Sequence, residues 1–133
     1  MKKLSVLSLV LFLTMGLCQI SLGQETIKAN EVQELDEIPQ FKGGMDGLIT
    51  YLSTNLKYPE AAKEKGIEGT VAVKFVVELD GSVSNVEILR GIGAGCDQEA
   101  VRVISETKNW SPGVKDGKKV RTEMRLPIQF KLS

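Results

Sequence analysis

The sequence predicts an α+β domain in which helices cover one face of a three-stranded antiparallel sheet. Three observations lead to this prediction. Residues 120–132 alternate apolar and polar side chains with a period of two, and over residues 71–78 the large apolar Val71, Val73, Phe75 and Val77 alternate with Ala72, Lys74, Val76 and Glu78, which is typical of strands with one buried face. Asp80-Gly81 marks a tight hairpin directly after the first of these stretches. Apolar residues at helical spacing precede the first strand and separate the hairpin from the last strand.

Residues 1–23 have the pattern of a secretory signal peptide. Lys2 and Lys3 precede an apolar run, and the small residues Ser21 and Gly23 stand at the −3 and −1 positions of a cut after residue 23. The alternative is a retained membrane anchor, because no charged residue follows Lys3 within this segment and about 20 apolar residues span a bilayer.

Residues 24–40 are polar, and their acidic side chains outnumber the single basic one, Lys28. The acidic residues are Glu25, Glu31, Glu34, Asp36 and Glu37. We expect this segment to be a flexible, solvated arm. The folded domain is then predicted to cover residues 41–133.

Two helices are expected at the start of this domain. Residues 45–55 carry an apolar stripe at helical spacing, formed by Met45, Leu48, Ile49 and Leu52. A second, short helix is bounded by Pro59 at its first position and by Gly66 just past its end. Both helices are interpreted as elements that pack on the core.

The first strand is followed by an irregular return strand over residues 83–89. Val86 and Ile88 share one parity, whereas Val83 falls on the other. A β-bulge near Ser84 or Asn85 would place all three side chains on one face.

The glycine-rich stretch 90–97 resembles a phosphate-binding loop only superficially. The dinucleotide pattern requires glycine at position 96, where this chain has Cys96, and it requires a parallel βαβ unit. We therefore expect no cofactor here, and instead a loop that leads into a helix capped by Asp97 and ending near Asn109. Trp110 is predicted to close one end of the core.

The last strand is predicted to lie at an edge of the sheet. Its even-numbered residues from Val120 to Leu132 are apolar or threonine, and they form the buried face. Pro127 cannot donate to a ladder, so it favours an edge position with its nitrogen facing outward. The predicted spatial order of the strands is 2-1-3. The outer face would be wet and would carry Lys74, Glu78, Glu87, Arg121 and Arg125.

Several function classes are disfavoured by composition. The chain has no histidine, which removes the commonest general base and the commonest metal ligand. A formal net charge of zero gives no electrostatic argument for nucleic acid. Ser111 has no histidine to activate it, so we expect neither an enzyme, nor a metal site, nor a small-molecule substrate. Once residues 1–23 are removed, Cys96 is a single thiol, and a disulfide-linked homodimer through it stays open.

A set of motifs resembles the C-terminal domain of TonB energy transducers over residues 34–132. They are Pro39-Gln40-Phe41-Lys42-Gly43-Gly44, Leu56-Lys57-Tyr58-Pro59-Glu60-Ala61-Ala62, Gly66-Ile67-Glu68-Gly69-Thr70-Val71, Phe75-Val76-Val77, Asp80-Gly81, residues 86–91, Cys96-Asp97, Glu99-Ala100, Trp110-Ser111-Pro112-Gly113 and Leu126-Pro127-Ile128-Gln129-Phe130. Their order along the chain is more specific than any single motif.

The resemblance implies a periplasmic domain that binds the TonB box of outer-membrane transporters by strand addition to its last strand. The implied partner-binding residues have backbone groups that share the parity of Pro127: Arg121, Glu123, Arg125, Gln129 and Lys131. Components of an inner-membrane transducer complex are further implied partners. The alternative function is an envelope scaffold or dimerisation domain with no transporter partner.

The resemblance departs from a full transducer in the segment before residue 41. Residues 24–40 span at most about 60 Å when fully extended, and they contain no proline repeats. If residues 1–23 are an inner-membrane anchor facing the periplasm, this length is short for reaching the outer membrane. We therefore expect a domain that binds transporter segments, rather than one that transmits force by itself.

Overall fold

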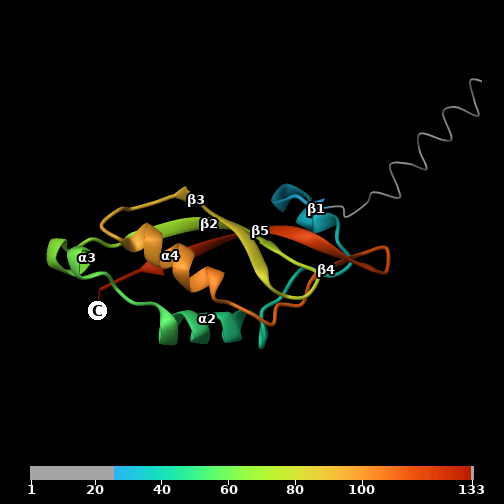
Figure 1. The fold of residues 1–133 in the computed structure, drawn as a ribbon, viewed down its shortest axis with the longest axis horizontal. Helices are drawn as coiled ribbons and strands as arrows, with labels where there is room; N and C mark the ends of the chain where they lie inside the picture. The colour runs from blue at the N-terminus through green and yellow to red at the C-terminus, as the bar shows by residue number, and fades with distance from the viewer. Residues whose placement is uncertain (1–25, 133) are drawn as a thin grey trace, which may run out of the picture.

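The computed structural model describes residues 26–132 of the chain, so the predicted signal peptide lies outside the described residues. Figure 1 shows the succession of helices and strands. In order they are β1 (Thr26–Ile27), the 3-10 helix η1 (Ala29–Glu34), α2 (Gly44–Asn55), α3 (Glu60–Lys65), β2 (Gly69–Val77), β3 (Val83–Arg90), α4 (Cys96–Ser105), β4 (Gly113–Lys115) and β5 (Lys118–Phe130). Among these residues, no helix is both long and apolar enough to cross a membrane.

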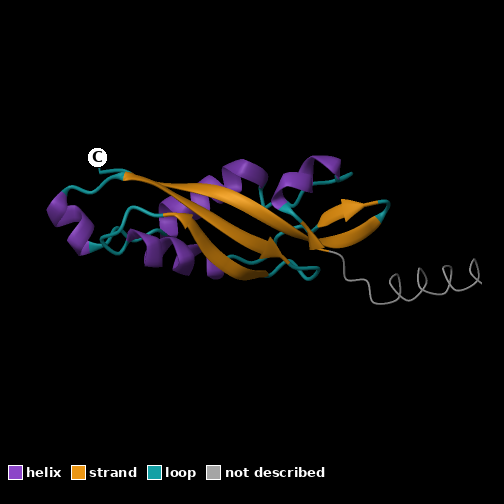
Figure 2. Ribbon diagram, turned by 90° about the horizontal axis from the view of Figure 1, so that it is seen from above, coloured by secondary structure: helices purple, strands orange, loops and turns teal. Residues whose placement is uncertain are grey.

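The sheet has the strand order β1-β5-β2-β3, and β4 also pairs with β5. β2 is antiparallel to both β3 and β5, which confirms the predicted α+β fold and its 2-1-3 order. α2 and α4 lie on one face of this sheet (Figure 1, Figure 2). Two short strands were not predicted: β1 runs parallel to β5, and β4 forms a hairpin with it. Strands of two or three residues are too short to show an alternating pattern.

The core lies between this face of the sheet and α4. β2 contributes alternate residues Val71, Val73, Phe75 and Val77, all buried. α4 contributes Cys96, Ala100, Val103 and Ile104, whose spacing places them on one side of the helix. Trp110 is 5% exposed and its ring centroid lies 5.4 Å from those of Phe41 and Phe75, so the predicted core role of this residue is confirmed.

The predicted bulge in β3 is confirmed. Lys74 pairs with Glu87 and Val76 pairs with Ser84, so β3 has one residue more than β2 across this interval. Asn85 adopts a positive φ of 52° within it. The extra residue shifts the parity of β3, and Val83, Val86 and Ile88 all pack against the core.

The predicted cap and end of α4 were wrong. Gly95, with a φ of 89°, is the N-cap, and the Asp97 side chain makes no capping bond. Instead, Asp97 Oδ1 accepts hydrogen bonds from the backbone N–H groups of Ile92 (2.9 Å) and Gly93 (3.2 Å), which holds the preceding loop. The helix ends at Ser105 rather than near Asn109, because the chain then turns back and Thr107 bonds to the Ile104 carbonyl at 2.6 Å.

The expectation of a flexible arm over residues 24–40 was wrong for the described part. β1 joins the sheet, and the Ile27 side chain is only 1% exposed. Further along, Gln40 and Ser111 exchange two backbone hydrogen bonds of 3.1 and 2.7 Å, and Asp36 N–H donates to the Val114 carbonyl at 2.8 Å. The acidic composition of the segment hides this docking, because most of its bonds use backbone groups.

Candidate functional site at the open edge of β5

β5 has different neighbours on its two sides. On one side, β2 pairs with residues 122–130 without a break in register. β4 pairs with residues 118–120 at the start of β5, and on the side away from β2, β1 pairs with Arg121 and Thr122. From Glu123 to Phe130 this second side has no strand partner among residues 26–132. The prediction of an edge strand is therefore correct for residues 123–130 and wrong for Arg121.

The orientation of the backbone groups on this open edge follows from one contact beyond β5. The Leu132 N–H donates to Glu68 Oε1 at 2.8 Å, and Glu68 directly precedes β2. Since N–H groups alternate in direction along an extended strand, even-numbered residues face β2 and odd-numbered residues face the open side. Pro127 therefore lacks a donor only on the open side, and its ladder with β2 loses no bond.

Side chains on β5 separate cleanly between the two faces of the sheet. On the core face, Thr122, Ile128 and Phe130 are buried, whereas Met124 and Leu126 stay partly exposed. The odd-numbered residues Arg125, Pro127 and Gln129, and Lys131 just beyond the strand, are exposed. A strand added to this edge would thus lie beside two apolar side chains on one face and polar side chains on the other.

The structure divides the predicted partner-binding residues into two groups. Arg121 donates from Nε to Glu78 Oε1 at 2.6 Å and from Nη1 to Thr26 Oγ1 at 2.7 Å. Glu123 Oε1 accepts a hydrogen bond of 3.3 Å from the Ala29 N–H. Both residues are thus engaged by the N-terminal segment. Arg125, Gln129 and Lys131 lie exposed beside the open edge.

The hydrogen bond from Arg121 also changes the pKa of its partner, Glu78. This hydrogen bond to the Glu78 carboxylate, followed by the one from the Ser84 hydroxyl, lowers the pKa of Glu78 below its ordinary value. Sequence reasoning placed Arg121 and Glu78 on the same wet face, which is correct, but it did not anticipate their pairing.

The opposite edge of the sheet, along β3, is irregular. Its register with β2 shifts twice, once at Leu89 and once at the bulge around Asn85. Bulges of this kind blunt an edge, because they interrupt the row of backbone groups that another strand would need. Of these two edges, only that of β5 keeps a regular register over residues 123–130, with a single donor missing at Pro127.

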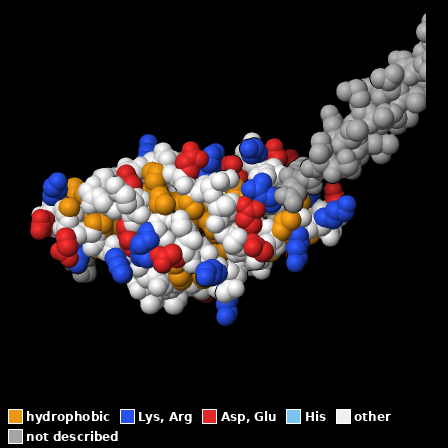
Figure 3. All heavy atoms as spheres, in the orientation of Figure 1, with side chains coloured by type: hydrophobic (Ala, Val, Ile, Leu, Met, Phe, Trp, Pro, Cys, Tyr) orange, Lys and Arg blue, Asp and Glu red, His pale blue; other side chains and the backbone are white. Residues whose placement is uncertain are grey.

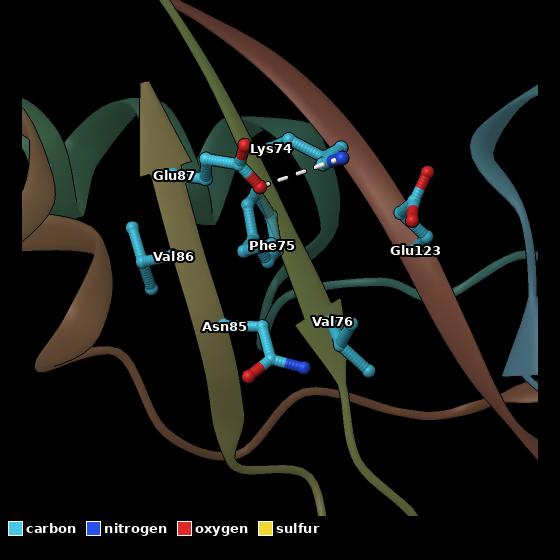
Figure 4. Close-up of a pocket in the computed structure, with 7 residues that line it drawn as sticks. All are labelled: Lys74, Phe75, Val76, Asn85, Val86, Glu87 and Glu123. Atoms are coloured by element: carbon cyan, nitrogen blue, oxygen red, sulfur yellow. Dashed lines mark ion pairs between the residues drawn. The ribbon is translucent and has the colours of Figure 1, made fainter. Parts of the chain in front are cut away.

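A hollow of about 390 Å³ opens on the outer face beside the β3 bulge, and Figure 4 shows the residues that line it. Its charged pair, Lys74 and Glu87, is 3.4 Å apart, and the Glu87 side chain is well exposed. The lining comprises Lys74, Phe75, Val76, Asn85, Val86, Glu87 and Glu123. These residues contain no nucleophile paired with a base, and no three potential metal ligands cluster anywhere within residues 26–132.

Cys96 is buried in the core with 0% exposure. Burial, followed by the nearby Asp97 charge, raises the pKa of its thiol. A disulfide with a second copy would require this buried sulfur to become exposed, so the folded structure gives the predicted homodimer through Cys96 no support.

The sequence and the fold of this chain are similar to those of known TonB proteins. Residues 54–132 match the family described as Gram-negative bacterial TonB protein C-terminal. Protein TonB of Vibrio cholerae is 35% identical over 77 residues, which are 57% of this chain and 31% of that protein. Protein TonB of Pseudomonas aeruginosa is 29% identical over 75 residues, which are 56% of this chain and 22% of that protein.

The matched part of this chain thus spans less than a third of the length of these relatives. The solution structure of the Helicobacter pylori TonB C-terminal domain superimposes with a TM-score of 0.50 at 23% identity, over 65% of this chain and 90% of that one, and it shares the fold. The family match runs from the end of α2 through β5 and leaves out β1 and η1. With more than half of its residues matched, the chain belongs to the family of Gram-negative bacterial TonB C-terminal domains.

Proposed function

We propose that this domain is a periplasmic module that binds the TonB box of outer-membrane transporters and thereby supports TonB-dependent transport. The observation that carries this proposal is the open, regular edge of β5 over residues 123–130. Membership of the TonB family supports the class of partner. The guest peptide, meaning the bound TonB-box segment, would add a strand to this edge.

The open edge is of suitable size for a short peptide. At about 3.3 Å per residue, residues 123–130 offer roughly 26 Å of edge, which accommodates a guest of up to about eight residues. Backbone hydrogen bonds to Glu123, Arg125 and Gln129 would supply affinity, and Pro127 would contribute only its carbonyl. The partly exposed Met124 and Leu126 would select apolar guest side chains on the core face.

Long-range electrostatic attraction contributes little to this proposal. Figure 3 shows acidic and basic side chains interspersed over the visible face, without a region of one sign. The formal net charge of the chain is zero. The proposed affinity therefore depends on the backbone ladder and on local side-chain contacts, and it should vary only weakly with salt concentration.

The experiment is an NMR titration of the ¹⁵N-labelled 133-residue chain with TonB-box peptides of transporters from the same genome. We expect the amide signals of residues 123–131 to shift, while those of β3 stay in place. A scrambled peptide of the same composition is the control. Equal responses to both peptides, or no response along β5, would overturn the proposal.

A second function is favoured by the same edge. Two copies could pair β5 with β5 to form the scaffold or dimerisation domain that the sequence left as the alternative. Sedimentation velocity of the chain without peptide distinguishes the two functions. A monomer over micromolar concentrations supports the peptide-binding module, whereas a dimer whose formation the TonB-box peptide does not affect supports the scaffold.

A further inference from the structure

A segment of the chain already occupies part of the β5 edge. Residues 26–34, comprising β1 and η1, are called here the N-terminal strap. Thr26 pairs with Arg121 and Ile27 pairs with Thr122, in parallel orientation. Figure 1 shows the strap beside β5, at the end of the molecule opposite the C-terminus. This side of β5 therefore accepts an added strand, and here the added strand belongs to the chain itself.

Three contacts hold the strap in place. The Ile27 side chain is 1% exposed, although it lies outside the main cluster of buried core residues. Thr26 Oγ1 accepts a hydrogen bond of 2.7 Å from Arg121 Nη1. The Ala29 N–H donates to Glu123 Oε1 at 3.3 Å. Ile27 thus anchors the strap and contributes little to the packing of β2 against α4.

The strap ends where the open edge begins. Arg121 and Glu123 share the outward parity of the open edge, and both are engaged by the strap. A guest peptide that extended past Glu123 toward Arg121 would need the backbone groups that β1 now uses. Two strands cannot pair with the same side of β5 at the same residues.

We propose that the N-terminal strap is an internal competitor of the guest peptide. A guest confined to residues 123–130 of β5 binds beside the strap, and a longer guest gains its extra pairing only when the strap leaves. This inference rests on the proposed function, because it concerns the regulation of the same edge.

The strap is attached more weakly than the other strands. β1 contributes a two-residue ladder, whereas β2 pairs with nine residues of β5. η1 is a 3-10 helix, whose hydrogen-bond geometry is poorer than that of an α-helix. Local opening of such a segment does not require the core to unfold.

Peptides of graded length test the competition. The core peptide is a TonB-box peptide of about seven residues, and two longer versions add about four residues at its N-terminus or at its C-terminus. Only one of these extensions runs toward Arg121, whichever direction the guest takes. Dissociation constants are measured by calorimetry for the wild-type chain, for Ile27→Asp and for Ile38→Asp. Ile38 is 49% exposed, so the same substitution there is the matched control.

The expected result is selective. The extended peptide that runs toward Arg121 binds the Ile27→Asp variant at least about tenfold more tightly than it binds the wild-type chain, because the strap no longer competes. The core peptide and the other extended peptide change less than about twofold. Ile38→Asp leaves all three dissociation constants unchanged.

Two outcomes would overturn the inference. If the core peptide binds but neither extended peptide responds to Ile27→Asp, the strap does not compete, although the proposed function stands. If no peptide binds any variant, the proposed function and the inference fail together. Hydrogen exchange at Val73 and Phe75 confirms that the core of the variant is intact.

A second variant is used if Ile27→Asp loses core protection. Ala29→Pro deletes the N–H that bonds to Glu123, and Lys28 already has the extended ψ of 155° that a residue before proline requires. The same peptide set is then measured, and the same results support or overturn the inference.

Discussion

The backbones of Gly81 and Trp110 lie next to each other and are joined by a hydrogen bond. The Trp110 N–H donates to the Gly81 carbonyl at 3.1 Å, and Gly81 has a φ of 85° in the β2–β3 hairpin. A Cβ atom at position 81 would lie 2.5 Å from the Trp110 carbonyl oxygen. The hairpin and the chain entering β4 are therefore held together at a point where only glycine fits.

Replacing Gly81 by alanine is expected to lower the free energy of unfolding by about 2 kcal/mol or more, because the left-handed φ and the backbone clash both oppose a side chain. Urea denaturation measures this loss. The control is Gly117→Ala, where φ is 77° and an added Cβ would meet no atom within 4 Å beyond the adjacent residues, with an expected loss of about 1 kcal/mol. Equal losses at the two positions would contradict the role given to Trp110.

The orientation of Pro127 can be tested through the stability of the domain. Pro127→Ala restores a donor on the open side only, so the free energy of unfolding should change by less than about 0.5 kcal/mol. Leu126→Pro removes a donor that faces β2 and should cost about 3 kcal/mol. Urea denaturation compares the two variants. A large loss with Pro127→Ala would mean that the outward parity is assigned wrongly.

The pairing of Glu78 with Arg121 should make stability depend on pH in the acid range. The pKa of Glu78 is lowered in the folded state, so its contribution is present above the ordinary value of 4.5 and is lost as the pH falls through the folded pKa. Glu78→Gln should destabilise the domain by roughly 1 kcal/mol at pH 7, with a smaller difference at pH values below 4.5.

Urea denaturation at several pH values measures this dependence. Glu87→Gln is the control, since the Glu87 side chain is 61% exposed in its pair with Lys74. The control should cost less than about 0.5 kcal/mol at every pH. A Glu78→Gln difference that stayed constant down to pH 2.5 would contradict the assigned pKa shift.

The buried thiol of Cys96 should be unreactive in the folded protein. In a Cys18→Ser background, alkylation at pH 8 is expected to be slower than for an exposed cysteine by about a hundredfold or more, because burial both raises the pKa and blocks access. Mass spectrometry follows the modification over time. A Ser105→Cys variant supplies the exposed comparison, and urea should abolish the difference. Rapid native labelling of Cys96, or a disulfide-linked dimer, would disprove its burial.

Local patterns in the sequence determined the central part of this fold. The alternation along β2 and β5, the Asp80-Gly81 turn and the irregular parity of β3 each depend on residues close together in the chain. These features predicted three strands, their order and the bulge. Pro127 predicted the edge, because its missing donor is tolerated only where no ladder bond is needed.

Only the tertiary structure decided which part of that edge is free. Thr26 bonds to Arg121 across 95 residues of sequence, and Ala29 bonds to Glu123 across 94. Neither contact leaves a periodic pattern, because a two-residue strand and a backbone N–H carry no side-chain signature. The sequence by itself therefore determined that β5 has a polar outer face and a proline at its edge. The folded chain determined that β1 covers Arg121 and Thr122 and that residues 123–130 are open, because long-range pairing depends on where the chain returns in space.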